Sequence, residues 1–109
     1  MTELLTVKST PVSPLCFGTM QFGGASDFKE SELIYNKCRE VGINFFDTAH
    51  TYNQGRSEKI LGALSQANRD ELLLGTKAAY DNSATKENIL ESFDESRKRL
   101  NTDFIDILY

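Results

Sequence analysis

The sequence predicts an α/β fold with parallel strands. Short apolar runs alternate with amphipathic segments along the 109 residues, in the order strand, helix, strand, helix, strand, helix, strand. Such alternation is typical of parallel strands joined by right-handed crossovers. The run Glu71–Gly75 is almost continuously apolar, as expected of a strand buried on both faces. No linker divides the chain, so we expect residues 1–109 to form one domain or part of one.

Two short elements are expected before the first helix. Residues 4–7 and 12–13 flank a turn and predict a short hairpin at the start of the chain. The run Leu15–Gly18 ends at a glycine and predicts a buried strand. Cys16 and Cys38 lie in apolar surroundings without a metal-binding spacing. We therefore expect two buried reduced thiols and no metal site.

The first helix is expected between Asp27 and Gly42. Asp27 with Glu30 fits an N-cap and capping box, and Gly42 fits the C′ position that ends a helix. Helical spacing predicts an apolar face made of Ile34, Cys38 and Val41. Residues 43–46 predict the second strand, with Asp47 at its end.

The second half of the chain is expected to hold two more helices. The polar residues 48–55 predict a loop, after which Ser57 can cap a helix. The apolar face of this helix is made of Ile60, Leu61 and Leu64. After a loop at 80–84, Thr85 can cap the last helix, whose charged side is expected to be solvated. Its other face holds Ile89, Phe93, Ser96 and Leu100. Residues 104–109 predict the fourth strand.

Two architectures fit this order of elements: a small doubly wound sheet, or the start of a (β/α)8 barrel. A complete barrel takes roughly 250 residues. The glycines after the first strand, Gly18, Gly23 and Gly24, do not have the GxGxxG spacing of a dinucleotide-binding turn, and the sequence has no P-loop. The pattern alone leaves both architectures open.

Composition excludes several function classes. Sixteen acidic and 12 basic residues give a net charge of −4, so we expect no nucleic-acid partner. No apolar run approaches the roughly 18 residues of a membrane span, so we expect no membrane partner. Residues 1–10 lack the layout of a secretory signal, and we expect a cytoplasmic protein.

Functional groups of parallel α/β folds collect at the carboxyl ends of strands. Asp47 follows the second strand, Lys77 follows the third, and Tyr52 lies in the loop after Asp47. A phenol has a pKa of about 10 and is a poor proton donor at neutral pH. A nearby ammonium favours the phenolate and lowers that pKa, and a carboxylate holds the ammonium in place. The three side chains therefore predict a site that exchanges a proton with a carbonyl or alkoxide oxygen.

The sequence of these segments resembles the sequence motifs of the aldo-keto reductase family. Residues 45–52 read FFDTAHTY and are followed by GRSE at 55–58. Residues 15–20 read LCFGTM, with Phe22 and Gly23 after them. Thr76-Lys77 and the run LNTDFIDILY at 100–109 agree as well, so the resemblance extends from about Pro14 to the end of the chain.

The resemblance implies a partial (β/α)8 TIM barrel, with residues 1–109 as the N-terminal, incomplete part of an NADPH-dependent oxidoreductase domain of roughly four βα units. It implies reduction of aldehydes or ketones, with hydride from the nicotinamide and without a metal. By position, Tyr52 matches the general acid, Lys77 the lysine beside it, and Asp47 the aspartate that pairs with the lysine and contacts the cofactor. The loop made of Gly18, Thr19 and Met20 matches the one that lies against the nicotinamide.

The sequence departs from the family in two places. Asn53 and Gln54 stand where the family usually has a glycine after the tyrosine, which affects local loop shape. The resemblance implies a fourth catalytic residue, a histidine just after the fourth strand, which we expect about two residues beyond Tyr109. His50, the only histidine, is in a different loop, and we interpret it as a loop or rim residue.

We expect four strands to leave two open edges and an exposed inner face, so the isolated chain should be inactive, aggregation-prone or dependent on a partner. One alternative is a non-enzymatic chain that associates with another protein through its open strand edges. Another is a different barrel enzyme in which Lys77 forms a Schiff base.

Overall fold

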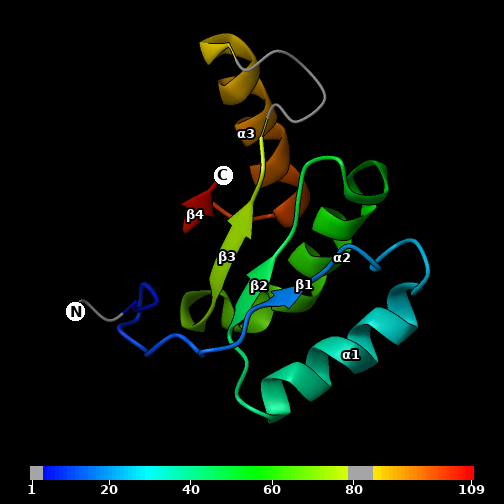
Figure 1. Ribbon diagram of the computed structural model, residues 1–109, viewed down its shortest axis with the longest axis vertical. Coiled ribbons are helices and arrows are strands. Elements are labelled where there is room, and N and C mark those ends of the chain that lie inside the picture. Colours follow the sequence, from blue (N-terminus) through cyan, green and yellow to red (C-terminus); the bar gives the residue numbers. More distant parts are fainter. Residues whose placement is uncertain (1–3, 79–84) are drawn as a thin grey trace.

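Four parallel strands form one sheet, and their order in the sheet is their order along the chain. The structure, a computed structural model, describes residues 4–78 and 85–109 (Figure 1). The predicted loop at 80–84 lies outside the described residues. The strands are β1 (Phe17–Gly18), β2 (Phe45–Asp47), β3 (Leu73–Thr76) and β4 (Ile107–Leu108).

The helices decide between the two predicted architectures. The α-helices are α1 (Phe28–Glu40), α2 (Arg56–Ser65) and α3 (Lys86–Leu100), and two 3-10 helices are η1 (Tyr52–Gly55) and η2 (Gln66–Glu71). A doubly wound sheet reverses its strand order and carries helices on both faces. Here the order never reverses, and all three α-helices contribute to a single core on one face. The predicted partial (β/α)8 barrel is confirmed, and its described part is an open sheet.

The core lies between the sheet and the three α-helices. Phe46 of β2 pairs in register with Leu74 of β3 and with Phe17 of β1. Phe46 and Leu74 are fully buried. The helices cover them with Tyr35, Cys38, Leu61 and Leu100.

Most predicted helix ends are confirmed. The carboxylate of Asp27 accepts a hydrogen bond from the Glu30 amide at 2.8 Å, and Thr85 caps α3 in the same way. Gly42, with φ of +94°, follows the end of α1 in the left-handed conformation. Val41 was wrongly assigned to the apolar face: it is 62% exposed, because the helix ends at Glu40 and Val41 turns away from the core.

The predicted cap of α2 is also wrong. The N-cap is Gly55, which provides no side chain, and the helix begins at Arg56. Ser57 is already inside the first turn, where its hydroxyl donates to the Phe22 carbonyl at 2.6 Å. Ser57 therefore joins α2 to the loop after β1 instead of capping the helix.

Two expectations for the start of the chain need correction. The hairpin is reduced to an antiparallel bridge between Leu5 and Pro11. Cys16 is exposed, whereas Cys38 is buried as expected. Cys16 precedes β1, which pairs on one side only and is not covered there by another described strand.

Among the described residues, no helix is long and apolar enough to cross a membrane.

Glycine allows α2 and α3 to approach each other closely. A Cβ atom built on Gly62 would lie 2.6 Å from the Leu100 carbonyl oxygen and 2.7 Å from that of Arg99. These neighbours are backbone atoms, which cannot rotate away. Gly62 therefore sets the distance between the two helices, and with it the position of the end of α3 above the sheet.

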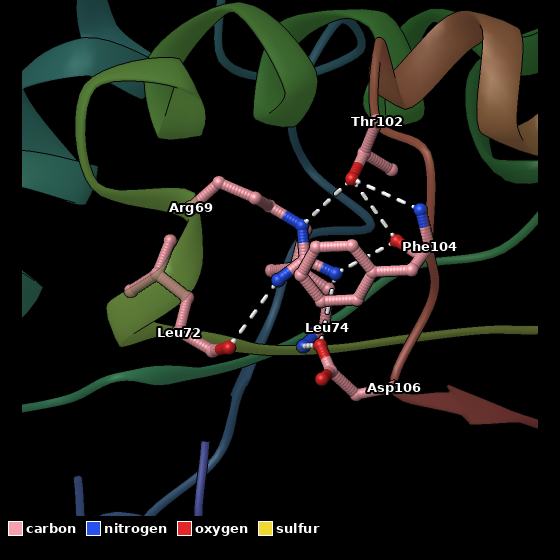
Figure 2. A network of polar contacts seen from close by, with 6 residues as sticks. All are labelled: Arg69, Leu72, Leu74, Thr102, Phe104 and Asp106. Atoms are coloured by element: carbon pink, nitrogen blue, oxygen red, sulfur yellow. Dashed lines mark hydrogen bonds and ion pairs between the residues drawn. The ribbon is translucent and has the colours of Figure 1, made fainter. Parts of the chain in front are cut away.

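A buried arginine joins the amino ends of β3 and β4 (Figure 2). Arg69 of η2 donates to the Asp106 carboxylate at 2.9 Å, to the Phe104 carbonyl at 2.8 Å and to the Thr102 hydroxyl at 3.1 Å. Its guanidinium carbon also lies 4.0 Å from the centre of the Phe104 ring. The Asp106 carboxylate accepts a further hydrogen bond from the Leu74 amide at 2.9 Å. The network fixes the segment before β4 against β3.

Replacing Arg69 tests how far the chain depends on this network. Arg69→Met should lower the free energy of unfolding by about 3 to 5 kcal/mol, because it leaves the Asp106 carboxylate buried without its cation. Arg97→Met is the matched control, since Arg97 pairs with the largely exposed Asp94 and should cost at most about 1 kcal/mol. Urea unfolding of both variants measures the difference. Equal losses would show that the Arg69 network contributes no more than a surface pair.

Candidate functional site

The three predicted site residues meet at the carboxyl ends of β2 and β3. Asp47 is the last residue of β2, Lys77 directly follows β3, and Tyr52 begins η1. The parallel register places Asp47 opposite Gly75, two residues before Lys77. The two charged side chains therefore leave adjacent strands at the same edge of the sheet.

The Lys77 ammonium is the centre of this site. It donates to Asp47 Oδ2 at 2.8 Å, to the Thr48 carbonyl at 3.0 Å and to the Tyr52 hydroxyl oxygen at 3.2 Å. An ammonium has three N–H donors, so these three acceptors match its capacity. The Tyr52 oxygen is used here as an acceptor, which leaves its own proton available to a ligand.

The surroundings of Lys77 keep it charged. Partial burial lowers its pKa, but the hydrogen bonds to Asp47 and Tyr52, together with the charge attraction of both groups, outweigh burial, and the net pKa is raised above its ordinary value. The ammonium also lies 4.9 Å from the Tyr52 ring centre and 5.4 Å from that of Tyr109. Lys77 is therefore a positive charge held against a phenol oxygen.

Tyr109 is a neighbour of the site that the sequence analysis missed. A Cβ on Gly75 would lie 3.2 Å from the Tyr109 ring, so the ring lies over the glycine. The Tyr109 amide donates to the Thr76 carbonyl at 2.9 Å, which fixes the residue beside β3. A tyrosine at the end of the last predicted strand gives no local signal of this contact, since the contact depends on the register of β3 with β4.

The loop after β1 lies against the end of β2. Thr19 is fully buried, and both its amide and its hydroxyl donate to the Asp47 carbonyl, at 2.9 and 3.0 Å. Gly18 precedes it at the end of β1, and Met20 after it is 53% exposed. The Thr19 side chain is therefore committed to holding this loop. Gly18 and Met20 remain partly open to solvent.

Asn53, which stands where the family usually has a glycine after the tyrosine, adds contacts between two loops of the site. Asn53 and Gln54 both have left-handed backbones, with φ of 51° and 58°, a conformation that glycine adopts without strain. The Asn53 amide donates to the carbonyls of Met20 and Phe22, at 2.7 and 2.8 Å. The side chain thus ties the tyrosine loop to the loop after β1, a contact that glycine cannot make.

A second set of charged residues lies behind the tyrosine loop, and the sequence analysis missed it. Glu58 of α2 is fully buried and pairs with Arg99 of α3 at 2.7 Å. Arg99 also bonds to the His50 ring nitrogen Nδ1. The expectation that the charged side of α3 is solvated is wrong for Arg99, which lies against α2. No local pattern predicts a pair between residues 41 positions apart.

Comparison with known proteins identifies the family. The family model "Aldo/keto reductase family" matches residues 14–109. The chain is 39% identical to norsolorinic acid reductase stcV of Emericella nidulans, over 90% of this chain and 31% of that protein. It is 36% identical to a protein of Arabidopsis thaliana named "Probable voltage-gated potassium channel subunit beta", over 90% of this chain and 33% of that protein.

A solved structure agrees with these matches. An aldo-keto reductase from Bacillus halodurans in its holo form superimposes with a TM-score of 0.79 at 30% identity, over 99% of this chain and 39% of that one. The chain therefore spans about a third of the length of the curated relatives it matches. The family match covers nearly all of the sequence and shows that the chain belongs to the aldo/keto reductase family.

Proposed function

We propose that this chain carries the proton-donating half of an NADPH-dependent oxidoreductase that reduces aldehydes or ketones to alcohols. The observation that carries the proposal is the position of the Lys77 ammonium, between Asp47 Oδ2 and the Tyr52 hydroxyl oxygen. Tyr52 would donate its proton to the substrate oxygen. Lys77 would stabilise the phenolate that remains, and Asp47 would hold the ammonium in place.

The residues around Asp47 fit a dinucleotide. Asp47 Oδ1 is buried and has no hydrogen-bond partner among the described residues, although buried carboxylate oxygens are normally paired. A ligand hydroxyl would supply the missing donor. Asp47, with the backbone of the Gly18-Thr19-Met20 loop, would hold the nicotinamide end of NADPH. When bound, the cofactor supplies the hydride.

The charge of Lys77 argues against the Schiff-base alternative. A lysine that attacks a carbonyl must be a free amine and is usually activated by a lowered pKa. Here the pKa is raised, and all three donors are engaged. Lys77 is suited to stabilising negative charge, not to nucleophilic attack.

Replacing the Tyr52 hydroxyl tests the general acid. Because the described sheet is open, we expect weak or no turnover from the 109 residues alone, so the measurement uses a chimera in which they replace the matching part of the Bacillus halodurans structure's chain. Tyr52→Phe should lower kcat for aldehyde reduction by about 10²- to 10⁴-fold. Tyr35→Phe removes a hydroxyl bonded to Asn68, away from the site, and should leave kcat unchanged. Similar rates for wild type and Tyr52→Phe would refute the role of Tyr52.

The pH dependence of stability tests the state of Lys77. A group whose pKa is raised on folding contributes stability that is present below its unfolded pKa and lost as the pH rises through its folded pKa. The difference in free energy of unfolding between wild type and Lys77→Met should therefore be constant below the ordinary lysine pKa of about 10.4 and shrink as the pH rises above it. Urea unfolding at several pH values measures this difference. A constant difference across the range would contradict the raised pKa.

The open edges of the sheet favour a second, non-enzymatic role for the 109 residues. In the described part of the chain, β1 pairs with β2 alone and β4 with β3 alone. Leu108 on β4 is 41% exposed and Tyr109 after it 61%. Unpaired edges recruit strands from other chains. We propose that the chain associates with a strand-bearing partner through β1 and β4.

Sedimentation velocity of the purified chain tests this association. Leu108→Lys places a charge on the β4 edge and should shift the distribution toward the monomer. Leu33→Lys makes the same change on the exposed surface of α1, where Leu33 is 64% exposed, and should leave the distribution unchanged. This role would be excluded if the wild-type chain stayed monomeric at all concentrations and bound no other chain that offers a β-strand.

A further inference from the structure

The buried carboxylate of Glu58 lies directly behind the site. It is fully buried, and its two oxygens have different partners. Oε2 accepts a hydrogen bond from the Thr76 hydroxyl at 2.7 Å, and Oε1 accepts one from Arg99 Nε at 2.7 Å. A carboxylate without solvent requires such a cation. Glu58 thus fixes Arg99 to the end of β3, at the residue that directly precedes Lys77.

The other end of Arg99 reaches the tyrosine loop. Its Nη2 atom bonds to His50 Nδ1, and because arginine only donates, His50 accepts with the neutral ring nitrogen. The side chain also lies across Gly55, where a Cβ would be 2.8 Å from Arg99 Cδ and 2.9 Å from Nε. Arg99 therefore contacts the loop both before and after Tyr52.

The Asn53 side chain ties the residue after Tyr52 to the carbonyls of Met20 and Phe22, but few hydrogen bonds within the loop hold Tyr52 itself. Two of the four residues of η1, Asn53 and Gln54, have left-handed backbones, which cost energy in residues other than glycine. The Tyr52 amide donates to the Ala49 carbonyl at 3.2 Å, within the loop itself. The His50 amide donates to the Lys77 carbonyl at 3.2 Å and joins the loop to the end of β3. Contacts from outside the loop must keep this arrangement.

We propose that Arg99 is a positioning residue that holds the Tyr52 hydroxyl against the Lys77 ammonium. Arg99 acts through Glu58 on the side of β3 and through His50 on the side of the loop. It bonds neither to the Tyr52 hydroxyl nor to the Lys77 ammonium. A planar guanidinium presents its donors in a rigid fork, so Nε faces Glu58 while Nη2 faces His50, and the angle between the two partners is fixed more strictly than by a rotatable lysine ammonium. The effect of Arg99 on activity rests on the proposed proton transfer by Tyr52. Its effect on the position of Tyr52 relative to Lys77 can be tested without that activity.

One double variant and one pair of His50 variants test the proposal in the 109-residue chain. Arg99→Met is combined with Glu58→Gln, so that no buried carboxylate is left without a cation. His50→Phe removes only the acceptor on the loop, and His50→Asn restores an acceptor near the position of Nδ1. Lys98→Met, an exposed neighbour on α3, is the control.

Amide hydrogen exchange and the titration of Lys77 are the readouts. Loss of a hydrogen bond to a charged group should speed exchange of the His50 and Tyr52 amides by about tenfold or more. Exchange of the Leu74 amide, in the core, should stay unchanged in His50→Phe. The pKa of Lys77, followed by NMR of the labelled lysine side chain, should fall toward its ordinary value as the Tyr52 hydrogen bond weakens. His50→Asn and Lys98→Met should match the wild type.

The outcomes separate this proposal from the proposed enzyme activity, because neither readout requires NADPH or a carbonyl. Wild-type exchange at His50 and Tyr52 in both His50→Phe and the double variant, with an unchanged Lys77 titration, would overturn the role of Arg99. Should the double variant unfold, the His50 pair decides, since His50→Phe leaves the ion pair between Glu58 and Arg99 in place. Failure of His50→Asn to restore slow exchange would likewise count against the proposal.

Discussion

The arrangement of α2, α3 and β3 depends on the contacts of one buried carboxylate, that of Glu58. It belongs to α2, accepts a hydrogen bond from Thr76 of β3 and pairs with Arg99 of α3. Apolar packing draws these elements together without fixing their mutual rotation, because the hydrophobic effect has no direction. A desolvated charge has strict requirements for its partners, so this one contact specifies how two helices and a strand are oriented.

Charged residues occupy both ends of the sheet but do different things there. At the amino ends, Arg69 and Asp106 pair with each other and join the beginnings of β3 and β4 by hydrogen bonds to the backbone of Leu72, Leu74 and Phe104. At the carboxyl ends, the Lys77 ammonium joins the Asp47 carboxylate to the Tyr52 hydroxyl oxygen, and Asp47 Oδ1 has no hydrogen-bond partner among the described residues. This division agrees with the general behaviour of (β/α)8 folds, in which one end of the barrel serves stability and the other chemistry.

The sequence was sufficient for the order of elements and for the meeting of Asp47, Tyr52 and Lys77, because strand ends and caps are local patterns. It failed where tertiary contacts overrule local preference. Ser57 looks like a cap, yet its hydroxyl is recruited by Phe22. Arg99 looks like one more charge on a solvated helix face, yet it pairs with a residue 41 positions away. The exposure of Cys16 follows from its place before β1, an edge strand that pairs on one side only, which an apolar run cannot reveal.

The sequential order of the strands also has a consequence for synthesis on the ribosome. Each new strand adds to the edge formed by the strand made just before it, so no segment must be threaded between earlier ones. The residues of the site emerge in the order Asp47, Tyr52, Lys77, and Arg99 follows after them. Arg99 is added 41 residues after Glu58, so the Glu58 carboxylate of α2 lacks its cation until α3 has been synthesised.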